Sequence, residues 1–197
     1  MIVDINGLIE MKNLKLLIII FSVPIHSLAQ NFINSDSAET AVFTQFGQEN
    51  LGKDFPDFNF KSVDGKEYKN ENLTGKTTLI NFWYASCVPC ISEFDALNSL
   101  FSKFKKNKDF QFLSFTFEND DTIKQIVRKY KLRYPIISIS GDSLSKLNFH
   151  QGFPTNIIVD RCGRIERFFE GGVRTPEEAR VMVNSVLIPA IKGLLNE

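Results

Sequence analysis

The chain has 197 residues, with 23 basic and 23 acidic side chains, 43% hydrophobic residues, 19 phenylalanines and three cysteines. This apolar content excludes an intrinsically disordered protein, and the zero net charge argues against general binding to polyanions, which needs clustered basic side chains. Three cysteines are too few for a disulfide-stapled scaffold and leave one without a partner in the chain, so we interpret cysteine here as a source of chemistry.

Residues 1–29 have the pattern of an export signal peptide. A short basic segment at residues 11–15 precedes an apolar run over 16–21, and small residues precede a cleavage point after Ala29. The run is too short to span a bilayer, which needs about 20 residues, so we expect a soluble product with no stable membrane anchor. Acidic residues before Met11 fit the pattern poorly, so Met11 is an alternative start of translation. A buried or interfacial N-terminal helix is the alternative interpretation.

The remaining chain fits one domain with a short extension. Residues 30–51 show no sustained hydrophobic period and predict a loosely ordered lead-in to a domain over 52–197. An Asp-Gly turn pair between two alternating segments predicts a β-hairpin over 58–68. The run over 77–84 is rich in β-branched and aromatic residues and becomes apolar on both faces, which predicts a buried central strand.

After residue 87 the hydrophobic period becomes helical. Apolar residues recur at three- and four-residue steps, which predicts a helix of about four turns; they are Ile91, Phe94, Leu97, Phe101 and Phe104. The further predictions are a strand over 110–117, a helix over 120–131, a strand over 135–139, a short helix over 143–149, strands over 155–159 and 164–169, and a helix that a capping box starts at Thr175. This order predicts a mixed sheet covered on both faces, a three-layer α/β sandwich.

Cys87 and Cys90 lie where the predicted central strand gives way to the first long helix. The free N–H groups and the dipole of a helix start stabilise a thiolate at Cys87, and the thiolate is the nucleophilic form. Three residues are nearly one helical turn, so Cys90 lies close enough to attack a mixed disulfide at Cys87. The pair predicts a redox-active disulfide with Cys87 as nucleophile and Cys90 as resolving thiol, and we expect no metal and no cofactor.

Two thiols at this spacing can also serve other purposes. A zinc site needs two further ligands, and the sequence after the signal offers isolated Cys162 and His150. A structural disulfide would close a very short loop and add little stability. A peroxide-reducing enzyme would need a proline and a threonine upstream of Cys87, which residues 80–85 do not supply. A non-catalytic carrier of copper or zinc stays as an alternative. We expect Cys162 to be a free, exposed thiol.

Two segments resemble the active-site segments of thioredoxin-fold proteins. They are Asn-Phe-Trp-Tyr-Ala-Ser-Cys-Val-Pro-Cys at 81–90 and Gly-Phe-Pro-Thr-Asn-Ile-Ile-Val-Asp at 152–160. With residues 52–58 and the following hairpin, they most resemble the exported TlpA/ResA-like branch of thiol-disulfide oxidoreductases. The resemblance implies a thioredoxin-like α/β/α sandwich with a mixed central sheet and an N-terminal β-hairpin addition.

The resemblance also implies substrate-binding residues. Pro154 matches a cis-proline beside the dithiol, and Trp83 matches an aromatic residue on the strand that leads to it. Phe153, next to this proline, is expected to line a substrate groove, and Thr155 follows it. Asn81 occupies a position where thioredoxins carry a buried acid.

Glu93 is the third candidate catalytic residue, beside Cys87 and Cys90. Helical geometry places it on the flank of the apolar stripe, about 80° from the centre, where it is either an exposed glutamate or a partly buried carboxyl close to the dithiol. The resemblance favours the second interpretation, in which Glu93 exchanges protons with Cys90.

The partners that the resemblance implies are protein thiols and disulfides. In that branch the usual direction is reduction, with electrons from a membrane donor such as a transmembrane thiol reductase and with apocytochrome c, in cytochrome c maturation, among the acceptors. We therefore expect a periplasmic or other extracytoplasmic reductase of protein disulfides, with no nucleic acid as a partner.

Overall fold

The computed structural model describes residues 48–196. The predicted signal peptide at 1–29 and most of the lead-in lie outside the described residues and stay predictions. The described end of the lead-in contains a short 3₁₀ helix, η1 (Gln48–Asn50). Within the described part of the chain, no helix has both the length and the apolar character that crossing a membrane requires.

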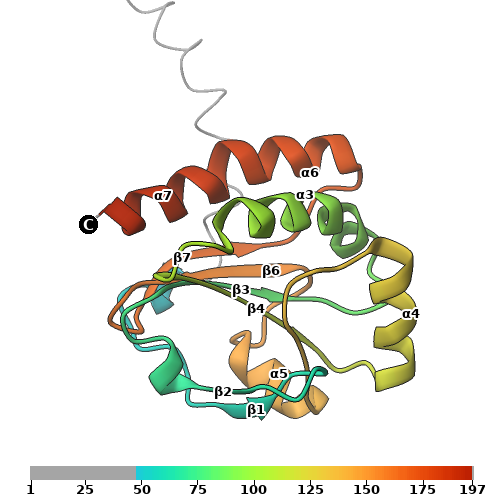
Figure 1. Ribbon diagram of the computed structural model, residues 1–197, viewed down its shortest axis with the longest axis horizontal. Helices are drawn as coiled ribbons and strands as arrows, with labels where there is room; N and C mark the ends of the chain where they lie inside the picture. The colour runs from blue at the N-terminus through green and yellow to red at the C-terminus, as the bar shows by residue number, and fades with distance from the viewer. Residues whose placement is uncertain (1–47, 197) are drawn as a thin grey trace, which may run out of the picture. The chain divides into compact units, whose positions relative to one another are not determined.

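A mixed five-stranded sheet forms the middle layer, in the order β5-β4-β3-β6-β7 (Figure 1). Strands β3, β4 and β5 run parallel, whereas β6 and β7 pair antiparallel with their neighbours. The strands are β3 (Thr77–Phe82), β4 (Phe110–Thr116), β5 (Ile136–Ser138), β6 (Thr155–Val159) and β7 (Ile165–Glu170). Strand β3 is central and buried along its whole length, which confirms the prediction from its two apolar faces.

Helices and a hairpin cover the two faces of this sheet (Figure 1). On one side lie α3 (Val88–Phe104), α6 (Pro176–Met182) and α7 (Ile188–Asn196). On the other side lie α5 (Gly141–Leu147) and the antiparallel hairpin of β1 (Asn59–Lys61) and β2 (Glu67–Lys69). Helix α4 (Asp120–Tyr130) packs Ile123 and Ile126 into the core on the α3 side. The predicted three-layer sandwich with its N-terminal hairpin is confirmed.

Strand β3 separates two hydrophobic cores. Leu79 and Trp83 belong to the core under α3, whereas Ile80 and Phe82 belong to the core that faces the hairpin and α5. Because side chains alternate along a strand, Asn81 faces α3 as well. The helix that carries the two cysteines therefore packs on the same face of the sheet as Asn81.

Two helices differ from their predicted form. Helix α5 begins two residues early because Ser140 caps it, with its Oγ accepting a hydrogen bond from the Ser143 N–H. The last helix starts with the predicted capping box at Thr175, then widens into a π-helical turn, η3 (Val183–Leu187), before it continues as α7. Pro189 has no N–H with which to continue the regular hydrogen-bond pattern at that point.

Candidate active site

Cys87 is the N-cap residue of α3 and is joined to Cys90 by a disulfide bond. Its Sγ accepts a hydrogen bond from the Cys90 N–H at 3.2 Å. Pro89 lies in the first turn of the helix, where a missing N–H leaves no bond unmade, and that turn contains no acidic residue. This arrangement favours negative charge on the Cys87 sulfur once the disulfide is reduced.

The disulfide lies at the rim of the core below α3. Cys87 is 3% exposed and Cys90 1%, whereas Val88 between them is 61% exposed. On the inner side the two sulfurs share a core with Trp83 and Phe94, whose rings meet edge to face at 5.2 Å. Access to the sulfurs is therefore restricted to one side, next to an exposed apolar residue.

The peptide bond between Phe153 and Pro154 is cis, as the resemblance implies. The loop after β7 packs Gly172 against this proline. A Cβ atom at Gly172 would lie 2.6 Å from Cγ of Pro154 and 3.0 Å from Oε1 of Glu93. These separations are below normal contact distances, so the loop reaches both predicted site residues only because position 172 is a glycine.

Glu93 is completely buried, at 0% exposure, so the interpretation as an exposed helix glutamate is wrong. Strand β6 and the Gly172 loop cover this flank of α3. Its Oε2 accepts a hydrogen bond from Nδ2 of Asn156 at 3.0 Å, and its Oε1 has no hydrogen-bond partner among the described residues. Burial raises the pKa of Glu93 to about 8, and the Asn156 hydrogen bond opposes this rise.

Three aromatic side chains form a cluster that the sequence analysis identified only in part. Tyr84 stacks on Phe117 with ring centroids 5.8 Å apart, and Phe153 meets both rings edge-on, at 5.3 and 6.2 Å. Phe117 is exposed and the other two are half-buried. We call Tyr84, Phe117 and Phe153 the aromatic cluster; it joins the ends of β3 and β4 to the residue before Pro154.

Three residues predicted to contact substrate are buried: Trp83, Pro154 and Thr155. Two of them, Trp83 and Thr155, form hydrogen bonds inside the protein. Trp83 is fully buried and donates from Nε1 to Oγ of Ser114 at 2.8 Å. Thr155 is fully buried as well, and its hydroxyl donates to the Gly152 carbonyl at 2.6 Å. Their side chains therefore present no surface to a substrate in this structure, because the first lies in the core and the second braces the chain next to the cis-proline.

Three contributors to the site escaped the sequence analysis. Glu118 accepts a hydrogen bond from the backbone just before Cys87, and Ser114 and Asn156 form buried hydrogen bonds on β4 and β6. The available signal was a polar residue inside each of the two strands predicted over 110–117 and 155–159. A buried polar side chain needs a partner, and that partner belongs to a distant part of the sequence.

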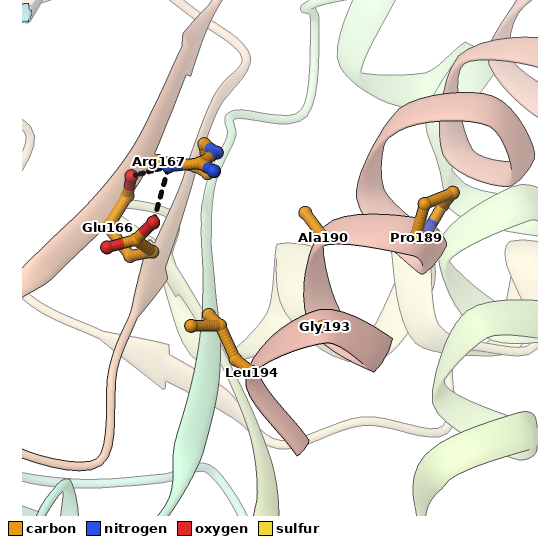
Figure 2. A pocket seen from close by; sticks show the side chains of 6 residues that line it. All are labelled: Glu166, Arg167, Pro189, Ala190, Gly193 and Leu194. Carbon is orange, nitrogen blue, oxygen red and sulfur yellow. Dashed lines mark hydrogen bonds and ion pairs between the residues drawn. The ribbon is translucent and has the colours of Figure 1, made fainter. Parts of the chain in front are cut away.

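Cys162 is free and exposed, which confirms the prediction for the third cysteine. A pocket of about 220 Å³ lies between β7 and α7 (Figure 2) and is lined by Glu166, Arg167, Pro189, Ala190, Gly193 and Leu194. Arg167 is paired with the neighbouring Glu166. The lining contains none of the residues around the disulfide, so we assign this pocket no part in the chemistry.

Comparison with known proteins agrees with the fold and the dithiol. The Redoxin family model matches residues 50–184. The thiol-disulfide oxidoreductase ResA of Bacillus thuringiensis subsp. konkukian (strain 97-27) is 28% identical over 130 residues, which are 66% of this chain and 75% of the relative. The thioredoxin-like protein YneN of Bacillus subtilis (strain 168) is 26% identical over 128 residues, 64% of this chain and 75% of the relative.

Solved structures share the fold. A putative protein disulfide isomerase from Bacteroides thetaiotaomicron matches with a TM-score of 0.64 and 23% identity, over 75% of this chain and 91% of that one. A putative thiol:disulfide interchange protein DsbE from Chlorobium tepidum matches with a TM-score of 0.60 and 21% identity, over 71% and 97%. This chain therefore belongs to the Redoxin family and is a TlpA/ResA-like thiol-disulfide oxidoreductase of thioredoxin fold, with Cys87 and Cys90 as its CxxC pair.

Proposed function

We propose that this protein reduces disulfide bonds of other proteins outside the cytoplasm, with Cys87 as the nucleophile and Cys90 as the resolving thiol. The observation that carries the assignment of roles is the position of Cys87 at the N-cap of α3, where its sulfur accepts the Cys90 N–H. A helix start stabilises a thiolate there. Cys90 lies one turn into the helix and is buried, and in this proposal it attacks the mixed disulfide from inside the protein.

The reaction consists of two thiol-disulfide exchanges. In the first, the Cys87 thiolate attacks one sulfur of the partner's disulfide, forms a mixed disulfide and expels the other sulfur as a thiolate. In the second, Cys90 gives up its proton and attacks the Cys87 sulfur, so that the Cys87–Cys90 disulfide forms and the second partner thiolate leaves. Two electrons pass from the protein dithiol to the partner, whose thiolates take up two protons.

In this scheme Glu93 is the acid and base that serves Cys90. A carboxyl with a pKa near 8 is matched to a thiol whose ordinary pKa is about 8.5, and proton transfer is most efficient between groups so matched. It lies three residues after Cys90 on α3 and contacts the loop that packs on Pro154. Glu93 takes the Cys90 proton in the second exchange and returns it when the disulfide is reduced again.

The aromatic cluster and Val88 supply the proposed docking face for the partner protein. Val88 and Phe117 are among the exposed large apolar side chains of the described residues, and Phe153 links the cluster to Pro154. An exposed apolar surface beside a reactive bond favours partner segments whose disulfide is flanked by apolar residues. Phe153, which is half-buried, stays the proposed side-chain contact, whereas Pro154, which is buried, is proposed to act through the backbone that precedes it.

Single cysteine variants test the roles of the two thiols. We expect Cys87→Ser to abolish insulin-disulfide reduction, and Cys90→Ser to accumulate a mixed disulfide with the partner that non-reducing electrophoresis detects. Full activity without Cys87, or a mixed disulfide that accumulates in Cys87→Ser instead, would sink the assignment.

The direction of electron flow is tested by the reduction potential of the dithiol against glutathione. A value near that of thioredoxin, about −270 mV, supports the reductase, for which we propose a membrane thiol reductase as electron donor. A value near −120 mV, close to that of the oxidant DsbA, would contradict it.

Export is tested by fusing residues 1–29 to an alkaline phosphatase that is active only outside the cytoplasm. We expect phosphatase activity from this fusion and from one that starts at Met11, and cleavage after Ala29 in N-terminal sequencing. A fusion that begins at residue 30 is the matched control and should stay inactive. Equal activity of all three fusions, or none in any, would contradict an export signal.

A further inference from the structure

A row of polar side chains crosses the sheet on its α3 face. Strand register places Ser114 on β4 and Asn156 on β6 directly opposite Asn81 on β3. All three are buried within a layer that is otherwise apolar. Burial of amide and hydroxyl groups is unfavourable unless each forms hydrogen bonds, so each side chain of this row needs a hydrogen-bond partner.

Four hydrogen bonds join the row to Trp83 at one end and to Glu93 at the other. Nε1 of Trp83 donates to Oγ of Ser114 at 2.8 Å, and this hydroxyl donates to Oδ1 of Asn81 at 3.3 Å. Nδ2 of Asn81 donates to Oδ1 of Asn156 at 2.9 Å, and Nδ2 of Asn156 donates to Oε2 of Glu93 at 3.0 Å. Every donor points toward the carboxyl group.

The chemistry of Trp83 determines the donor-to-acceptor direction of the hydrogen bonds along the row. An indole N–H donates and never accepts, so Ser114 must accept at its oxygen and direct its own hydrogen elsewhere. Asn81 provides the acceptor only while its oxygen faces Ser114, and that orientation turns its NH₂ group toward Asn156. If both amides were reversed, the Ser114 hydrogen would lose its acceptor, and a lost buried hydrogen bond is unfavourable.

We propose that Trp83, through Ser114, Asn81 and Asn156, keeps a hydrogen-bond donor against Oε2 of Glu93 and thereby holds the exchangeable proton of this carboxyl on Oε1. Oε1 is the oxygen that lies near Gly172, which also contacts Pro154. Asn156 is thus a positioning residue, and Trp83 acts on the carboxyl from the far end of the row. The proposal deepens the role proposed for Glu93 and rests on it for its consequence in catalysis.

Among the groups around Glu93, the hydrogen-bonded row has the main polar effect on the ionisation of its carboxyl. Asn156 lowers the pKa of Glu93 against the larger effect of burial. The phenol of Tyr134 is the titratable neighbour that responds to Glu93: its pKa is raised first by burial and then by the carboxyl charge. On α3 itself, Cys87 and Cys90 form a disulfide and do not titrate in the oxidised protein.

The test uses NMR on the oxidised protein, without turnover. The chain contains one tryptophan, so its indole N–H gives one resonance that reports the far end of the row. In a titration from acid to alkaline pH, we expect this resonance to shift with the same midpoint as the side-chain carboxyl carbon of Glu93. In Asn156→Leu the Glu93 midpoint should rise by about one pH unit, because the carboxylate loses a charge-assisted hydrogen bond, and the indole shift should vanish.

Ser114→Ala separates the hydrogen-bonded chain from a field effect through space. It leaves Trp83 and Glu93 in place but removes the link between them, so the indole shift should vanish while the Glu93 midpoint rises less than in Asn156→Leu. Thr78→Val is the matched control, since it removes from the same strand as Asn81 a buried hydroxyl with no hydrogen-bond partner in the described structure. It should leave both signals as they are.

Either of two results would overturn the proposal: an indole shift that persists in Ser114→Ala, or an unchanged Glu93 midpoint in a folded Asn156→Leu. If Asn156→Leu does not fold, Trp83→Phe replaces it and should raise the Glu93 midpoint by a smaller amount. The role of Glu93 in exchange is judged separately, by insulin reduction in Glu93→Gln. The proposal for the hydrogen-bonded row is therefore tested independently of the catalytic role of Glu93.

Discussion

The backbone N–H of Ala85 donates to Oε1 of Glu118 at 2.7 Å, which ties the residues before Cys87 to the end of β4. The carbonyl of Glu118 accepts a hydrogen bond from the Ser138 hydroxyl at 2.7 Å, so the same residue is held to β5. The position of the redox-active loop thus depends on one half-buried carboxylate, that of Glu118, which follows the neighbouring parallel strand β4.

Removal of that carboxylate should loosen the loop. We expect Glu118→Ala to lower the free energy of unfolding by about 1 kcal/mol, the usual contribution of a hydrogen bond, and to slow insulin reduction several-fold. Glu118→Gln is the matched control, because its amide oxygen can still accept the Ala85 N–H. Urea denaturation and turbidity assays measure the two effects; equal behaviour of the two variants would show that the hydrogen bond has no such role.

A methyl group at position 172 should disturb the cis-proline and Glu93 together. Because a Cβ there would lie 2.6 Å from Cγ of Pro154, we expect Gly172→Ala to lower the free energy of unfolding by about 1–3 kcal/mol, as overpacking does. Gly193→Ala is the control: it lies within α7, where a Cβ meets nothing within 4 Å, and it should be neutral or stabilising. Thermal unfolding of both variants measures the two changes in stability, and equal stabilities would contradict the predicted clash at position 172.

The buried carboxyl should make stability depend on pH. The pKa of Glu93 is about 8 in the folded protein against an ordinary 4.5, so between these values the unfolded chain has released a proton that the folded chain retains. The free energy of unfolding must therefore fall as pH rises through this window, by up to about 1.4 kcal/mol per pH unit.

Glu93→Gln removes this titration. The free energy of unfolding of this variant, minus that of the unmodified protein, should therefore increase from pH 5 to pH 8. Urea denaturation of the two oxidised proteins at several pH values measures the difference. Glu118→Gln, which removes a carboxyl that is not fully buried, is the control for loss of charge alone. A difference in the free energy of unfolding that stays constant with pH would contradict the raised pKa of Glu93.

The third cysteine should account for all free thiol in the oxidised protein. Cys162 is exposed and unpaired, and Cys87 and Cys90 share a disulfide. A thiol reagent such as Ellman's should therefore find one reactive group per chain, and none in Cys162→Ser. We expect this variant to reduce insulin at the unmodified rate and to lack any disulfide-linked dimer on non-reducing gels; a loss of activity would place Cys162 in the site.

Local patterns in the sequence were sufficient for the elements and for the dithiol. The hydrophobic period predicted α3 and the buried β3, and the strand-to-helix junction placed Cys87 at a helix start, because these features depend on residues close together in the chain. The buried Glu93, the internal Trp83 and the row from Ser114 to Asn156 depend on which strands pair and in which register. Register is decided by contacts among residues 31 to 75 positions apart. The sequence was therefore enough to sort the three cysteines into a pair and a single thiol, whereas the environment of Glu93 was decided only by the tertiary structure.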